Sequence, residues 1–448
     1  MTGLSEAGPI ITGHSSSDDS IPFSPDTEDA PFDFHYAMSV YHSDEDDADE
    51  PFEDDAVTEE MYARGGDMQG IDWTRQTMPR ASYREQRVQD YENYLSLEDI
   101  DEINQDPHQT DPPGLQEATH MTSEEFYTFK YAKLTERCSI GHFQLRNLLW
   151  ATTKDDIYYM YGDTVRQWSP PLCSSRQIMD VSTANSPQSL IIKISSMACG
   201  QNILMVGGFM GEYAFRRLDD MTAPVHYGVT TDHANGIANH IHISEGRKGG
   251  IKAVVSSNDK KARYIDLDTR ETEHTISFPF AVNCSALSPD RNLLCVVGDS
   301  TATLVVNVDS FENVMSMDEH RDYSFACCWS PDGRLLATGN QDKTTRVYDI
   351  RNTSKALHVL GAKVGAIRSL QFSRDGRHLI AAEPIDFVHV YDTATFESSQ
   401  VIDMFGDIAG VALTPDDQAL YIANSEERIG GIFEFQRQQP NWIDWTML

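Results

Sequence analysis

Residues 320–350 have the sequence HRDYSFACCWSPDGRLLATGNQDKTTRVYDI, in which three short apolar runs are separated by turn residues. Ser-Pro-Asp-Gly at 330–333 is a turn signal, because proline pre-sets one backbone dihedral and glycine supplies a positive φ. Asn-Gln-Asp-Lys at 340–343 is a second tight connection. The apolar runs are rich in β-branched and aromatic residues, which is typical of short strands. The sequence therefore predicts an antiparallel meander here.

The same pattern recurs along the chain with a period near 42 residues. Turns of the Ser-Pro-Asp type lie at Pro289, Pro331, Arg374 and Pro415, which are 42, 43 and 41 residues apart. Each interval has room for four short strands, and a repeat of this length is typical of a β-propeller blade. One such sheet cannot bury both of its faces, so blades must stack around an axis. We therefore expect an all-β ring.

The repeat resembles a WD-repeat (WD40) blade. His320 lies where that family has its Gly-His histidine, Thr338 at the second-strand Ser/Thr, Asp342 at the tight-turn aspartate, and Tyr348-Asp349 at Trp-Asp. In the family these side chains form a hydrogen-bond chain through each blade, and a buried network of this kind requires every member to be satisfied. The resemblance implies a structural network of His320, Thr338, Asp342 and Tyr348.

Further segments are similar to one group of WD-repeat proteins of fungi and plants, most of which are uncharacterised. The likeness covers most of residues 68–436 and implies relatives rather than a defined activity. Its strongest segments are 142–152, 296–300, 339–344, 365–369 and 382–392, with a weaker one at 68–73.

Charge divides the chain into an acidic arm and a globular body. Residues 1–120 carry 30 Asp and Glu against 5 Lys and Arg, whereas residues 121–448 carry 40 against 30. Residues 1–67 cannot bury enough apolar surface to offset the entropy of ordering, so we expect a disordered arm. The favoured interpretation is an arm that only increases solubility. The alternative is a phosphoregulated arm, with Ser43, which precedes an acidic run, as the candidate phosphorylation site.

Residues 68–96 form a short aromatic and helical motif within this acidic region. Ser82-Tyr83-Arg84-Glu85 fits a capping box, and the apolar side chains that follow it lie on one helical face. This motif either docks on the propeller or binds a partner, and docking is favoured because the motif is apolar. The side chains on the expected face are Val88, Tyr91 and Leu95.

An acidic linker at 97–118 leads to a propeller predicted over 119–437, with a tail at 438–448. The last repeat has only three strands, which would leave an unpaired sheet edge. Residues 126–134 alternate aromatic and polar side chains, so we expect them to supply the closing strand. The seven blades are expected at about 139–181, 189–230, 235–279, 280–319, 320–361, 362–405 and 406–436.

The sequence contains no phosphate-binding loop, nucleophile elbow or zinc-protease motif, so we expect no enzymatic activity and no cofactor. His233, His240 and His242 lack the further ligands that a tetrahedral metal site needs. Small basic pairs do not form a nucleic-acid surface, so no nucleic-acid partner is expected.

Seven scattered cysteines without a Cys-x-x-Cys pair favour a reducing compartment. No apolar run approaches the ~18 residues of a spanning helix, so no membrane association is expected. The predicted protein is a cytoplasmic monomer, with the nucleus as a second location.

Partner binding is expected on the propeller face that collects the loops before each first strand and the turns between second and third strands. The favoured function is a non-enzymatic scaffold for protein or peptide partners. The main alternative is a substrate receptor of a cullin–RING ubiquitin ligase, because Tyr348-Asp349-Ile350-Arg351 resembles the Trp-Asp-x-Arg motif of such receptors, with Asp349 and Arg351 as its charged members. An enzyme site at the channel mouth is less favoured. The candidate face residues are Phe209, Asp259, Lys260, Asp299, Arg321, Tyr323, Lys343, Glu383, Asp386, Phe387 and Arg428.

Overall fold

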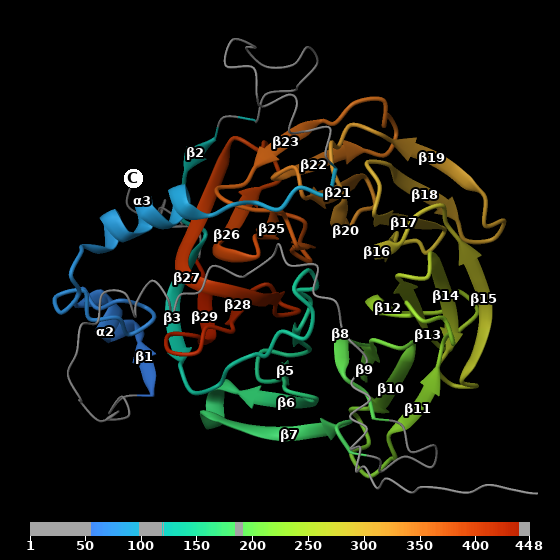
Figure 1. Cartoon of the computed structure of the whole chain (residues 1–448), viewed down its shortest axis with the longest axis horizontal. Helices are drawn as coiled ribbons and strands as arrows, with labels where there is room; N and C mark the ends of the chain where they lie inside the picture. The colour runs from blue at the N-terminus through green and yellow to red at the C-terminus, as the bar shows by residue number, and fades with distance from the viewer. Residues whose placement is uncertain (1–54, 98–118, 120, 184–190, 439–448) are drawn as a thin grey trace, which may run out of the picture. The chain divides into compact units, whose positions relative to one another are not determined.

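The computed structural model describes residues 55–97, 119, 121–183 and 191–438 (Figure 1), all within one compact unit that spans residues 43–448. The candidate phosphorylation site Ser43, most of the acidic linker and nearly all of the C-terminal tail lie outside the described residues.

Five consecutive four-stranded antiparallel sheets make up blades one to five (Figure 1). Blade one contains β4 (Leu149–Ala151), β5 (Ile157–Tyr161), β6 (Thr164–Ser169) and β7 (Ser174–Asp180), with the 3-10 turn η1 (Pro170–Leu172) before β7. Blade two contains β8 (Ile194–Gly200), β9 (Ile203–Gly208), β10 (Glu212–Arg217) and β11 (His226–Val229). Blade three contains β12 (Ala238–Glu245), β13 (Ile251–Ser257), β14 (Lys261–Asp266) and β15 (Glu271–Ser277). Blade four contains β16 (Val282–Leu287), β17 (Leu293–Gly298), β18 (Thr303–Asn307) and β19 (Asn313–Met317). Blade five contains β20 (Ser324–Trp329), β21 (Leu335–Asn340), β22 (Thr344–Asp349) and β23 (His358–Gly361).

The last two blades share one long strand, β27 (Ser398–Leu413). Its first part pairs with β26 and its last part, from Ile408, pairs with β28, so the outer strand of blade six continues as the inner strand of blade seven. When this strand is counted in both sheets, the pairing gives seven four-stranded units, and the predicted all-β propeller is confirmed. The other strands here are β24 (Ser369–Phe372), β25 (His378–Ala382), β26 (Ile385–Asp392), β28 (Ala419–Asn424) and β29 (Gly431–Arg437), and the short β2 (Thr122–Ser123) pairs parallel to β27.

The second strands of blades two, six and seven are buried along their whole length. Every residue of β9, β25 and β28 is buried, because other blades pack on both faces of each sheet. Such strands have continuous apolar sequences rather than an alternating pattern. The core therefore lies between blades, and each blade depends on its neighbours for burial.

Blade seven is completed by a strand from the N-terminal side of the propeller. Strand β3 (Tyr127–Lys133) pairs antiparallel with β29, with Phe129 opposite Phe435 and Ala132 opposite Phe433. The Gln400 side-chain carbonyl accepts hydrogen bonds from the backbone N–H groups of Phe126 and Tyr127, at 2.8 and 2.9 Å. The structure thus places residues 126–134 at the edge where the ring closes.

Part of the arm that we expected to be disordered is ordered against this closing strand. Strand β1 (Ala56–Thr58) pairs with β3 and buries Val57, and helix α2 (Glu59–Ala63) follows directly. Thr58 caps this helix by accepting a hydrogen bond from the Met61 N–H at 3.3 Å. The expectation was wrong for these residues because it rested on the composition of the whole arm. A strand of three residues can be ordered within such a segment when a sheet edge is available for backbone pairing.

Helix α3 (Arg80–Asp90) differs from the helix expected from the sequence. It begins two residues before Ser82, with Pro79 at the N-cap position, and Tyr83 and Arg87 are its buried residues. Val88 is 39% exposed, and Tyr91 and Leu95 lie beyond the last helical residue, so the three side chains do not form one helical face. No helix among the described residues is long and apolar enough to cross a membrane.

The hydrogen-bond network implied by the family resemblance is present in blade five for three of its four members. His320 Nδ1 lies 2.9 Å from Asp342 Oδ2, and His320 Nε2 lies 2.8 Å from Thr338 Oγ1. Tyr348 is fully buried among apolar side chains, and no hydrogen bond joins it to Thr338 in the described structure. Thr338 is also fully buried, so this network lies inside the blade.

We predict that Phe129→Ala destabilises the protein by roughly 3–5 kcal/mol, because it leaves a cavity between the closing strand and Phe435. Urea denaturation of the full chain measures this change. Lys130→Ala, on the exposed side of the same strand, should change stability by less than ~0.5 kcal/mol. Equal stability of the two variants would show that this strand does not close the ring.

A second prediction concerns Asp342. Burial alone would raise the pKa of this carboxyl group, but the charge and hydrogen bond of His320 and the hydrogen bonds of Thr344 and Arg321 lower its pKa to about 2. A lowered pKa in the folded state stabilises the protein above the unfolded value near 4 and is lost as the pH falls toward 2. Asp342→Asn should therefore cost about 2 kcal/mol at pH 7, with a difference from wild type that shrinks between pH 4 and pH 2. Denaturation at several pH values measures it, with Asp318→Asn on the exposed surface as the control, and a difference that is constant with pH would contradict the prediction.

Candidate functional site

One face of the ring collects the turns between second and third strands and the loops that lead into each first strand, because strand direction alternates within a blade. On this face, hereafter the loop face, Phe209 lies in the turn between β9 and β10, Lys260 between β13 and β14, and Lys343 between β21 and β22. The face therefore brings together side chains from every blade.

A segment from the N-terminal arm crosses the loop face over blades five to seven. We call residues 67–97 the strap. Figure 1 shows part of it, in blue, continuing from α3 toward β21. Hydrogen bonds join the strap to positions 226 to 360 residues away, so its place on the face is set by tertiary contacts.

The strap is first anchored to blade seven by Gln69 and aromatic rings. The Gln69 side-chain amide donates to the Phe405 carbonyl at 2.7 Å, and its carbonyl accepts from the Phe405 N–H at 2.5 Å. Gln69 is 1% exposed, so these bonds satisfy a polar group that has left water. The rings of Trp73 and Tyr83 lie 5.3 and 5.2 Å from the Phe405 ring.

Two arginines of α3 hold the central part of the strap. Arg84 Nη1 donates to Asp386 Oδ2 and Arg84 Nη2 to Asp403 Oδ1, both at 2.6 Å. Arg87 binds both oxygens of Asp386, at 2.8 and 2.9 Å. Such paired contacts are short, charge-assisted and geometrically specific.

The far end of the strap reaches blade five. Asn93 donates to the Gln341 carbonyl at 2.9 Å and accepts from the Gln341 side-chain amide at 3.0 Å. The Ser96 N–H donates to Asp322 Oδ2 at 2.8 Å. Tyr91 packs against a small buried cluster that includes Phe387. Residues 68–96 are thus docked on the propeller along their length.

Three of the candidate face residues are consequently not exposed. Glu383, Asp386 and Phe387 have exposed fractions of 0, 1 and 4%. The strap covers Asp386 and Phe387, while Glu383 accepts hydrogen bonds from the backbone N–H groups of residues 363–365 and contacts His389 Nε2 at 2.7 Å. The expectation that these side chains form an open surface was wrong, because the sequence does not reveal what covers a turn.

The remaining candidates are distributed over blades two to five and blade seven. Asp259 is bound by Arg263, and Asp299 accepts a hydrogen bond from Asn283 at 2.9 Å, so both carboxylates are committed within the propeller. The candidates that keep exposed or partly exposed side chains are Phe209, Lys260, Arg321, Tyr323, Lys343 and Arg428.

An apolar patch beside Phe209 was missed by the sequence analysis. Phe143 is 54% exposed and Met210 is 60% exposed. His142 lies between the two aromatic rings, 4.9 Å from Phe143 and 5.9 Å from Phe209. The pKa of His142 is lowered to about 4, mainly by burial and to a smaller extent by the positive charges of nearby arginines. The His142 ring is therefore neutral at pH 7. We define the apolar patch as His142, Phe143, Phe209 and Met210.

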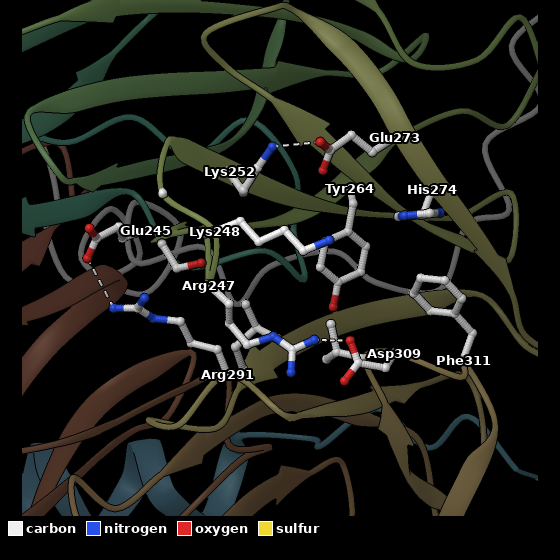
Figure 2. A pocket seen from close by; sticks show the side chains of 15 residues that line it. Glu245, Arg247, Lys248, Lys252, Tyr264, Glu273, His274, Arg291, Asp309 and Phe311 are labelled. Carbon is white, nitrogen blue, oxygen red and sulfur yellow. Dashed lines mark hydrogen bonds and ion pairs between the residues drawn. The ribbon is translucent and has the colours of Figure 1, made fainter.

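A concavity of about 490 Å³ lies between blades three and four. It is lined by the loops that join the first and second strands of these two blades. Figure 2 shows that its charged side chains largely face one another. Arg247 pairs with Asp309, Arg291 lies 3.2 Å from Glu245, and Lys252 lies 2.7 Å from Glu273. Its charges are therefore mostly compensated. Nowhere among the described residues do three His, Cys, Asp or Glu side chains come together as a metal site.

Comparisons with known proteins agree with this architecture. The family model for the WD domain, G-beta repeat, matches residues 311–349. An uncharacterised protein of Schizosaccharomyces pombe is 24% identical over 315 residues, which cover 64% of this chain and 86% of the relative. The U3 small nucleolar RNA-associated protein 15 homolog of Xenopus tropicalis is 23% identical over 55% of this chain and 44% of its own length.

Among solved structures, a chain in the crystal structure of the mitotic checkpoint complex superposes with a TM-score of 0.55. The two sequences are 16% identical, and the match covers 74% of this chain and 95% of the other. At this identity the similarity concerns the fold. Together with the repeat period, the blade-five network and the repeat model that matches residues 311–349, it shows a β-propeller fold similar to that of WD40-repeat proteins.

Proposed function

We propose that the protein is a non-enzymatic scaffold that binds a protein or peptide partner through the open part of its loop face. The observation that carries this proposal is the apolar patch, where two large side chains remain more than half exposed. Contiguous exposed apolar residues on a soluble domain are typical of interaction sites.

The patch has the composition of a binding hot spot. Burying a Phe or Met side chain contributes roughly 1.5–3 kcal/mol, and aromatic side chains dominate the energetics of many interfaces. Lys193 lies with its ammonium group 5.4 Å from the centre of the Phe209 ring and is itself exposed. A partner segment with an apolar side chain flanked by a carboxylate would match both features.

The relatives support a role within assemblies. WD40-repeat proteins serve as protein-interaction scaffolds, and one relative is by its name associated with a small nucleolar RNA. We infer a nuclear location alongside the cytoplasmic one, a monomeric chain, and partners that are proteins rather than nucleic acid or membrane. The nuclear inference rests on that relative.

A variant of the apolar patch tests the proposal. Phe143→Ser combined with Met210→Asp should abolish recovery of the partners that wild-type protein retains in affinity purification with mass spectrometry, because both apolar contacts are lost. Leu172→Ser is the matched control, since Leu172 is 74% exposed in η1, away from the loop face. Unchanged partners in the patch variant, with a wild-type melting temperature, would refute the assignment.

The receptor subunit of a cullin–RING ligase is the second candidate function. Arg351 has a 66% exposed side chain and donates to Asp349 Oδ1 at 2.9 Å, so the pair is accessible from solvent. If this function holds, Arg351→Ala should abolish co-purification with a cullin adaptor. Absence of any adaptor from the wild-type purification would end this alternative.

A further inference from the structure

The part of the loop face beneath the strap is acidic. Asp386 and Asp403 bind the strap, and Asp407 lies close by with Arg146 of the propeller at 3.5 Å. The strap supplies three cations to this region, from Arg80, Arg84 and Arg87 in α3. Without the strap, the propeller would present clustered carboxylates here to solvent.

Asp386 is positioned to receive more than one guanidinium group. It lies near the start of β26, at a register shift in the pairing with β27, with φ at +67°. This left-handed conformation is uncommon for residues other than glycine. The Oδ1 atom of Asp386 also accepts a hydrogen bond from the Gly406 N–H at 2.8 Å, which fixes the carboxylate. Both oxygens then face Arg87, and one also faces Arg84.

Two aromatic rings complete the site around Arg84. The guanidinium carbon lies 4.0 Å from the centre of the Phe405 ring and 4.7 Å from that of Phe387. A planar guanidinium group can stack on rings while it forms paired hydrogen bonds at its edge, and an ammonium group cannot. The combination of two rings and two carboxylates therefore selects arginine over lysine.

The spacing of the three arginines explains how a helix fits the site. Positions 80, 84 and 87 lie at i, i+4 and i+7, so their side chains share one helical face. An isolated helix of the length of α3 is marginally stable in water, so the propeller stabilises it. Any segment with this arginine spacing could present the same face.

The strap remains bound because it belongs to the same chain. It is preceded by β1, which pairs with β3, and followed by Thr119, whose N–H donates to the Val359 carbonyl at 2.8 Å. A tethered segment has an effective concentration in the millimolar range for short flexible links, so a modest intrinsic affinity keeps the site filled. A partner can compete if its own segment binds more tightly.

We propose that Asp386, Asp403, Phe387 and Phe405 form a recognition site for a partner helix with arginines spaced as in α3, and that the strap occupies this site in cis until such a partner displaces it. The site lies beside the apolar patch on the same face and extends the proposed function, on which it rests for the assignment of that face to partner binding.

Peptide binding to an opened full-length protein tests this inference. Arg84→Glu with Arg87→Glu should release the strap by repulsion from Asp386 and Asp403. A fluorescein-labelled synthetic peptide with the sequence of residues 78–97 should then bind at least tenfold more tightly to this variant than to wild type, as measured by fluorescence anisotropy. Adding Asp403→Asn to the opened variant should weaken binding at least tenfold.

A matched peptide separates arginine recognition from simple charge attraction. The same peptide with lysine in place of Arg84 and Arg87 keeps its charge, and we expect it to bind at least tenfold more weakly. Equal binding of the two peptides would overturn the proposed selectivity. An opened variant that melts like wild type but binds neither peptide would overturn the site itself.

A second measurement covers the case in which the opened variant does not fold. A protease site inserted between residues 98 and 118 of the otherwise wild-type chain allows the strap to be cut from the propeller after purification. An excess of the labelled arginine peptide should then replace the strap, and no incorporation would overturn the proposal. Because these assays use only the chain's own sequence, their failure is distinct from failure of partner capture at the apolar patch.

Discussion

Closure of the ring by β3 and β29 is the constraint on which the other features depend. Each blade buries its faces only against its neighbours, so an open ring would expose apolar surface and an unpaired sheet edge. Closure joins residues about 300 positions apart, with Phe129 opposite Phe435. Such non-local pairing has a large loop-closure cost, which the buried aromatic side chains of the last blade offset.

The closing strand also determines where the arm begins its path. Because β3 lies at the outer edge of blade seven, the chain preceding the propeller starts beside that blade, and β1 adds to the same sheet. All five basic residues of the first 120 lie between Arg64 and Arg87, within an otherwise acidic region. This concentration of arginines matches the acidic surface that the strap covers, so charge as well as topology directs the arm to the loop face.

The propeller could be predicted from the sequence because its signals are local and repeated. The turn at Pro331 and the spacing to Pro289 and Arg374 follow from turn chemistry and period alone. The docked helix could not be predicted in the same way. Its buried residues, Tyr83 and Arg87, interrupt the apolar pattern that a sequence analysis seeks, and the carboxylate that makes burial of Arg87 favourable lies 299 residues away. Likewise, tyrosine in place of tryptophan at 348 preserves the packing of blade five but not the last hydrogen bond of its network.

The loop face thus has two parts with different physical character. The open part, around Phe143 and Met210, can contribute affinity through apolar burial, which has little directional selectivity. The covered part, around Asp386 and Asp403, contains charges whose hydrogen-bonding geometry discriminates between partners. A segment that engages both parts would gain affinity from the first and specificity from the second. Displacement of the strap would break its hydrogen bonds and ion pairs with the carboxylates beneath it, whichever partner displaces it. Only a partner that supplies guanidinium groups in the same positions would replace these interactions.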